Sequence, residues 1–82
     1  MHYDNATQFI NDCNIGMDIE FDYNGIGYGV LGWFDNGPLA YRKDNFGYCE
    51  QHFKTPDELL DGFIIDGKPL RSIVTQIELL LH

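Results

Sequence analysis

Alternation with a period of two dominates residues 17–30 and is the strongest constraint on the fold. Residues 17–23 alternate between apolar and acidic side chains, and the acids are Asp18, Glu20 and Asp22. This pattern is typical of a β-strand with one covered face and one open face. Asn24-Gly25 follows, and this pair favours a two-residue type I′ turn because both central residues need a positive φ. The segment therefore predicts a hairpin of strands 17–23 and 26–34.

The turn fixes which residues face each other across this hairpin. With a two-residue turn, Tyr23 lies opposite Ile26, and the pairs that follow are Phe21 with Tyr28 and Ile19 with Val30. That face is apolar, so the rest of the chain must cover it. The other face carries the acids, whose partners in this register are Gly27, Gly29 and Leu31. No basic residue faces the acids, and we expect them to be open and unpaired.

A second turn at residues 35–38 leads to a predicted strand at 39–43. If Asn36-Gly37 is also a two-residue loop, Trp33 lies opposite Ala40 and Leu31 lies opposite Arg42. Leu31 and Trp33 then share the open face with the acids. Large apolar residues on an open face indicate a cover, either residues 44–53 of the chain itself or a partner. The predicted contact surface consists of Asp18, Glu20, Asp22, Leu31 and Trp33.

Helical patterns lie on both sides of the predicted strands. Residues 4–13 predict a short helix capped by Asp4 or Asn5. Thr55 and Glu58 form a capping box that begins a second helix, and Pro56 fits its first helical position. Pro69 opens a third helix to about Leu80, whose apolar stripe is Leu70, Ile73, Val74, Ile77 and Leu80 or Leu81. Leu79 lies beside this stripe and indicates either a homodimer contact or fraying at the chain end.

These segments predict one α+β domain over residues 1–82. Its sheet is a three- or four-stranded antiparallel meander, with residues 46–53 as the least regular strand. The N-terminal short helix and the two C-terminal helices pack on one face of that sheet.

Charge restricts the possible partners. The chain has 13 acidic and five basic residues, a net charge of −8, and residues 1–41 contain no Lys or Arg. Such a chain repels nucleic acid and anionic lipid, and it attracts a protein with a basic surface. The sequence shows neither a transmembrane run nor a signal peptide, so we expect a cytoplasmic protein.

Metal and catalytic sites are weaker alternatives. A calcium loop starting at Asp18 fails, because Tyr23 and Gly29 occupy the positions that require Gly and Glu. Cys13, Cys49 and His52 leave open a small metal-binding or hydrolytic domain, although they do not form paired zinc half-sites. The glycines of residues 25–29 lack a following helix for phosphate binding, and they indicate either a bend or close approach by another segment. We expect no cofactor.

Several segments together resemble a known group of proteins. They are Phe9-Ile10, residues 19–25 with Tyr28, residues 53–60, residues 65–70 and Ile73. In these segments the chain resembles small hypothetical proteins of low-GC Gram-positive bacteria, their phages and mobile elements. The resemblance implies the order helix, hairpin, helix, helix and an accessory origin, and it brings no activity or catalytic residue.

The sequence thus favours a non-catalytic protein that binds another macromolecule. One form of this hypothesis is a phage- or mobile-element-borne inhibitor, whose acidic strand face binds a basic surface of a host nucleic-acid-processing or defence protein. The alternatives are a small metal-binding or hydrolytic domain and a homodimeric accessory protein.

Overall fold

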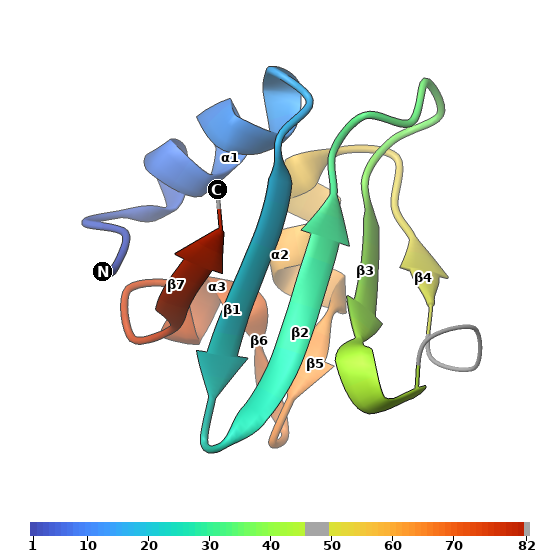
Figure 1. The fold of residues 1–82 in the computed structure, drawn as a ribbon. Helices are drawn as coiled ribbons and strands as arrows, with labels where there is room; N and C mark the ends of the chain where they lie inside the picture. The colour runs from blue at the N-terminus through green and yellow to red at the C-terminus, as the bar shows by residue number, and fades with distance from the viewer. Residues whose placement is uncertain (46–49, 82) are drawn as a thin grey trace.

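The computed structural model describes residues 1–45 and 50–81, which form an α+β fold. The helices are α1 (Ala6–Asn14), α2 (Pro56–Gly62) and α3 (Leu70–Ile73), and a 3-10 turn, η1, spans Lys43–Asn45. The strands are β1 (Asp18–Tyr23), β2 (Ile26–Leu31), β3 (Leu39–Arg42), β4 (Gln51–His52), β5 (Ile64–Ile65), β6 (Lys68–Pro69) and β7 (Glu78–Leu81). Five strands form an antiparallel sheet in the order β4-β3-β2-β1-β7, and β5 and β6 form a separate hairpin (Figure 1). The α+β class and the meander of β1 to β4 are confirmed, but the sheet has a fifth strand, β7, in place of the predicted three or four. Of the predicted strand 46–53, β4 covers Gln51–His52, and residues 46–49 lie outside the described residues.

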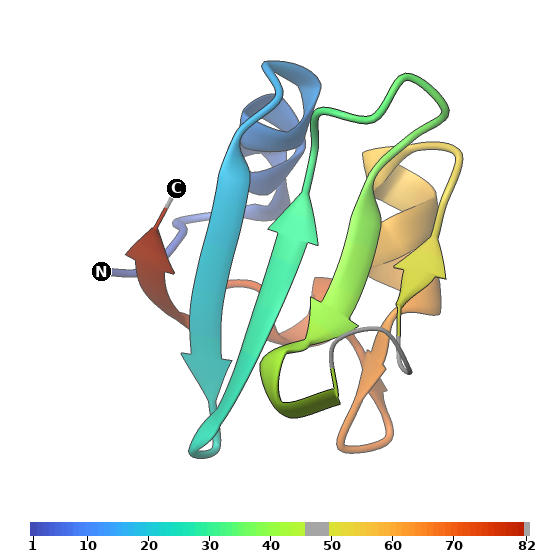
Figure 2. The same cartoon turned by 45° about the vertical axis from the view of Figure 1, so that its right-hand side comes forward.

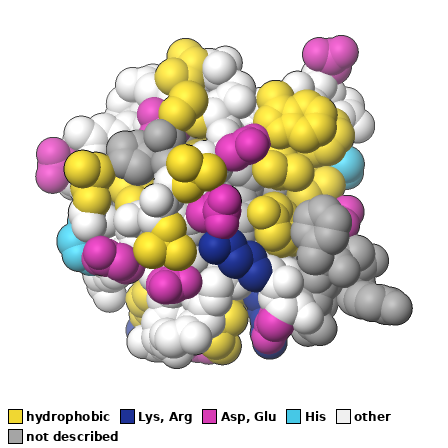
Figure 3. Space-filling model, in the orientation of Figure 1, with side chains coloured by type: hydrophobic (Ala, Val, Ile, Leu, Met, Phe, Trp, Pro, Cys, Tyr) yellow, Lys and Arg dark blue, Asp and Glu magenta, His cyan; other side chains and the backbone are white. Residues whose placement is uncertain are grey.

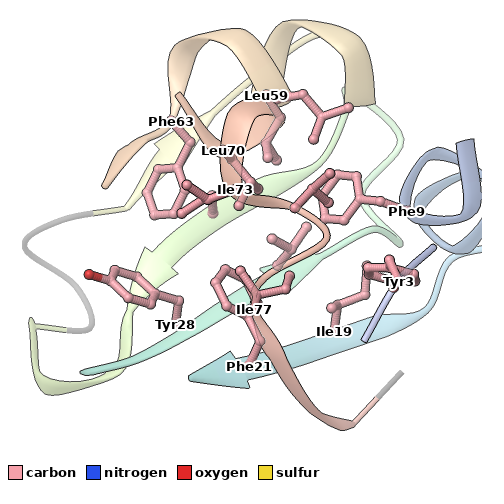
Figure 4. Packing of buried hydrophobic residues seen from close by; sticks show 14 of the residues in the cluster. Tyr3, Phe9, Ile19, Phe21, Tyr28, Leu59, Phe63, Leu70, Ile73 and Ile77 are labelled. Carbon is pink, nitrogen blue, oxygen red and sulfur yellow. The ribbon is translucent and has the colours of Figure 1, made fainter. Parts of the chain in front are cut away.

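All three helices lie behind one face of the five-stranded sheet, which Figure 2 shows clearly. The apolar side chains of β1 and β2 point toward these helices and pack with them into the core (Figure 4). The largest fully buried side chains are Phe9, Phe21, Ile19, Leu59, Leu60, Ile65, Leu70, Ile73, Ile77 and Val30. In the described residues no α-helix covers the other face of the sheet. Alternate residues of β1 therefore point either into the core or toward this open face.

The β1–β2 hairpin has the predicted register. Phe21 pairs with Tyr28 and Asp22 pairs with Gly27. Asn24 and Gly25 have φ values of 51° and 79°, the positive values that a two-residue type I′ turn requires. The two-residue turn thus places the apolar residues of β1 on the covered face and the acids on the open face.

The predicted pairing beyond the second turn is wrong. Strand β2 ends at Leu31, and Leu31 pairs with Leu39 rather than with Arg42; Ala40 pairs with Val30 rather than with Trp33. The connection is longer because a turn closes from Gly37 N to Phe34 O (3.2 Å) and Pro38 cannot donate to a ladder. As a result, Arg42 moves to the helix-covered side, opposite Tyr28.

The predicted helix starts are confirmed. The side chain of Asn5 accepts from Gln8 N (3.1 Å) at the start of α1. The side chain of Thr55 accepts from Glu58 N (3.1 Å) at the start of α2, and Pro56 is the first helical residue. In a capping box the carboxylate of Glu58 would accept from Thr55 N; here it accepts from the preceding backbone amide, Lys54 N (3.2 Å).

The predicted third helix is wrong in its second half. Helix α3 ends at Ile73, and residues 78–81 form strand β7 along the free edge of β1. The stripe residues Leu70, Ile73, Val74 and Ile77 are all buried, as a helix would bury them. As a strand, residues 78–81 pair with the backbone N–H and C=O groups at the edge of β1. A longer helix would leave those groups of β1 at an open edge of the sheet. Leu79 is buried opposite Phe21, so the helical surface suggested for a homodimer does not exist.

Candidate functional site

The open face of the sheet brings together the residues predicted as a contact surface. Figure 3 shows acidic side chains gathered near the middle of this face, with hydrophobic side chains beside them and a basic side chain adjoining. Asp18 is exposed, while Glu20 and Asp22 are half-buried between their neighbours. Leu31 is half-buried, and Trp33 is 56% exposed in the loop that follows β2.

One acid of the row has a basic partner, which corrects the expectation that all three are unpaired. Lys43 lies on the same face as the acids, and its Nζ is 2.5 Å from Oε1 of Glu20. Both side chains are about one-third exposed, so this ion pair contributes at most about 1 kcal/mol to stability. Its larger effect is on the charge of the open face, because Lys43 neutralises Glu20, the middle one of the three acids.

Glycines in β2 make this ion pair possible. A Cβ on Gly27 would lie 3.0 Å from Cδ of Lys43, and the ring of Tyr41 lies directly over Gly29. The side chains of Tyr41 and Lys43 therefore cross β2 toward the acids of β1, and the predicted close approach to the glycines is confirmed. Burial and the charges of Glu20 and Asp18, opposed by Lys43, raise the pKa of Tyr41.

The two outer acids remain available. Within the part of the chain that the structure describes, neither Asp18 nor Asp22 makes an ion pair or a side-chain hydrogen bond. They lie four residues apart on one strand, which separates their α carbons by about 13 Å. The surface therefore presents two separate negative charges rather than the continuous row that the sequence predicts.

An aromatic group borders the acids. The rings of Trp33 and Phe34 stack with centroids 4.2 Å apart and planes at 22°. The edge-to-face contact of Phe34 with His52 of β4, at 5.3 Å, ties this stack to the sheet. Leu39, opposite Leu31 in the register, is only 4% exposed although it lies on the face away from the helices. Residues 46–49 of the predicted cover lie outside the described residues.

Sequence reasoning missed three members of this surface: Lys43, Tyr41 and Phe34. The sequence did contain a signal for Tyr41 and Lys43: side chains alternate along a strand, so these two residues lie together on one face and Arg42 lies on the other. The wrong register of that strand assigned Arg42 to the open face instead. Phe34 joins through the loop after β2, and no periodic pattern predicts the orientation of a loop side chain.

The cysteines and histidines do not form a metal cluster in the described residues. No three His, Cys, Asp or Glu side chains there come together as metal ligands, and Cys49 lies outside the described residues. Cys13 is a free thiol in the core, 3% exposed. Burial, and then the nearby charge of Asp12, raise the pKa of Cys13 to about 12.

We expect Cys13 to resist alkylation in the folded protein. With a pKa of about 12, only about one thiol in ten thousand is ionised at pH 8, and the thiolate is the reactive form. Peptide mass spectrometry after iodoacetamide treatment at pH 8 should find Cys13 unmodified in buffer and modified in denaturing urea. Modification in buffer at the rate of a free peptide thiol would contradict the buried position.

Two of the pockets among the described residues lie away from the open face. One is lined by the N-terminal residues, α1 and Leu79, and there the Tyr3 hydroxyl donates to Asp12 Oδ2 (2.6 Å). Burial and this hydrogen bond raise the pKa of Tyr3 far above its usual value, so the phenol stays protonated in alkaline solution where an ordinary tyrosine ionises. The other pocket lies beside the β5–β6 hairpin and is lined in part by Tyr28, Arg42 and Asp66.

Comparison of the chain with protein-family models, with curated proteins and with solved structures gives no match. The resemblance drawn from the sequence stays a prediction. None of the helices in the described residues is long and apolar enough to cross a bilayer.

Proposed function

We propose that this chain is a non-catalytic binding protein that uses the open face of its sheet to hold a protein partner with a basic surface. The contact surface comprises Asp18, Asp22, Leu31 and Trp33, with Glu20 as a neutralised member. The observation that carries the proposal is that Asp18 and Asp22, which have no ion-pair or side-chain hydrogen-bond partner among the described residues, lie next to an exposed tryptophan on the face opposite the helices.

Charge supports a basic partner. Three of the five basic residues, Arg42, Lys43 and Arg71, pair with carboxylates of the chain itself. On the open face Lys43 offsets only Glu20, so Asp18 and Asp22 make this face negative within a chain whose net charge is −8. Such a field accelerates encounter with a cationic protein and opposes contact with nucleic acid or anionic lipid.

Within this proposal, the protein acts in the cytoplasm and originates from a phage or mobile element. Its partner is a host nucleic-acid-processing or defence protein, whose phosphate-binding surface receives the carboxylates of β1. The ion pair of Lys43 with Glu20 limits the imitation of a phosphate backbone, since it leaves two charges about 13 Å apart. Recognition then depends on the apolar neighbours as well as on charge.

The double substitution Asp18→Asn plus Asp22→Asn is expected to abolish partner capture. Both residues are on the face away from the core, so the thermal midpoint should change little. The measurement is affinity capture from a lysate of the source cells with the tagged wild-type chain and the double variant. The matched control is Glu20→Gln plus Lys43→Gln, which removes this ion pair without changing the net charge of the face and should therefore retain most of the captured partner.

Equal capture by the wild type and the double variant would refute the proposed surface. Self-association through the same face is the competing function, because Trp33 is 56% exposed. Sedimentation velocity at two protein concentrations separates the two: a concentration-dependent dimer that Trp33→Ser disrupts would favour the homodimer.

A further inference from the structure

Trp33 has the geometry of a stacking platform. One face of its indole rests on Phe34, and His52 supports Phe34 from the sheet. Yet Trp33 remains 56% exposed, so much of the indole faces solvent. A ring that is held on one side and exposed on the other is ready to receive a planar group without reorganisation.

The platform lies next to Asp18, whose carboxylate has no ion-pair or side-chain hydrogen-bond partner in the described part of the chain. Beyond the β1–β2 ladder, Gly32 N donates to Met17 O (3.1 Å), and a Cβ on Gly16 would lie 3.7 Å from Cβ of Trp33. Trp33 thus continues the register in which Asp18 pairs with Leu31, and it is a diagonal neighbour of Asp18. Such neighbours are roughly 7–8 Å apart, a distance that one long side chain spans.

Three kinds of planar group stack on an indole in macromolecular complexes: a nucleobase, an aromatic ring and an arginine guanidinium. A nucleobase brings a phosphate, which the net charge of −8 and the nearby Asp18 repel. An aromatic ring leaves Asp18 without a partner. A guanidinium both stacks on the indole and donates to a carboxylate, so it satisfies both features of the site.

We propose that the partner presents an arginine to this site, and that its guanidinium stacks on Trp33 and donates to Asp18. This inference rests on the proposed function and specifies the chemistry of its partner. Lysine serves the same carboxylate less well, because its ammonium is a strongly hydrated point charge without a planar face. The surface therefore selects arginine over lysine, in addition to selecting positive charge.

The test uses the intact chain and synthetic peptides of glycine and serine that carry arginine, lysine or citrulline at identical positions. Trp33 is the only tryptophan, so its fluorescence reports directly on the platform. At low salt, the arginine peptide should change the emission of Trp33 and bind several-fold more tightly than the lysine peptide. Citrulline, which is planar but neutral, should not bind.

Variants locate the effect. Trp33→Leu should weaken binding of a fluorescently labelled arginine peptide roughly tenfold, measured by anisotropy, and leave the lysine peptide nearly unchanged. Asp18→Asn should weaken both peptides. Circular dichroism confirms that each variant is folded, which is expected because both side chains are exposed.

The outcomes separate this inference from the proposed function. No binding of the arginine peptide, or equal binding of the arginine and lysine peptides with unchanged Trp33 emission, would overturn the arginine inference alone. Quenching of Trp33 by single-stranded oligothymidylate would overturn it in favour of base stacking. Failure of the proposed function appears elsewhere, as unchanged partner capture by the Asp18 and Asp22 double variant.

Discussion

Gly37→Ala is expected to lower the free energy of unfolding by about 3 kcal/mol or more. Gly37 has a φ of +111°, which an L side chain rarely adopts. In addition, a Cβ at this position would lie 1.9 Å from the carbonyl oxygen of Phe53 and 2.8 Å from that of Lys54. Both atoms belong to the backbone, so no side-chain rotation relieves the clash. Urea denaturation followed by circular dichroism measures the loss.

Gly25→Ala is the matched control. Gly25 also has a positive φ, +79°, but nothing lies within 4 Å of its missing Cβ. Its substitution costs only the backbone conformation, about 1 kcal/mol. The difference between the two variants therefore measures the clash with the segment before α2. Equal losses in the two variants would show that this close approach does not exist.

The same contact links stability to the candidate site. Phe53 N donates to Pro38 O (3.0 Å), so the segment before α2 holds the end of the loop between β2 and β3. That loop carries Trp33 and Phe34. In Gly37→Ala protein that still folds, we therefore expect the stacking of Trp33 on Phe34 to be lost before the β1–β2 hairpin is.

The hairpin and the helix starts were predictable because their signals are local. Asn24-Gly25 fixes the register of β1 and β2 through backbone conformation alone, and Thr55 fixes the start of α2 through one side-chain hydrogen bond. Neither depends on distant parts of the chain. The alternation of residues along β1 was enough to predict its apolar face, and the burial of that face required only that some helix cover it.

The errors arose where distant segments decide the structure. In residues 70–77 the side chains of the predicted apolar stripe are buried, as expected for a helix. The residues that follow form a strand instead, because they pair with the free edge of β1. The loop before β3 is longer than its turn signal suggests, because it also contacts the segment before α2. That length sets the register of β3, and through it the ion pair of Lys43 with Glu20.

The candidate site shows the same division. The position of the acids on the open face was predictable from β1 alone, whereas the sequence left open whether residues 44–53 or a partner cover Trp33, which is 56% exposed. Which acid is neutralised was not predictable, because it depends on the side chains of β3 crossing the glycines of β2. Charge pattern in sequence thus gives the face of the acids, and tertiary register decides which of them are free.

Phe21→Ala is expected to lower the free energy of unfolding by about 4 kcal/mol. Phe21 is fully buried, stacks on Tyr28 with ring centroids 5.4 Å apart, and lies opposite Leu79 of β7. Its removal leaves a cavity where the hairpin, the edge strand and the helices meet. Much of the folding free energy of a domain of this size, typically about 5–10 kcal/mol, would be lost.

Asp22→Ala is the control for this substitution, because the next residue along β1 points to the open face. It makes no ion pair or side-chain hydrogen bond in the described residues, so its loss should change the free energy of unfolding by about 0.5 kcal/mol or less. Equilibrium urea unfolding of both variants is the measurement. Comparable losses would mean that Asp22 is structural rather than available to a partner. The expected contrast between adjacent residues assigns one parity of β1 to stability and leaves the other to binding.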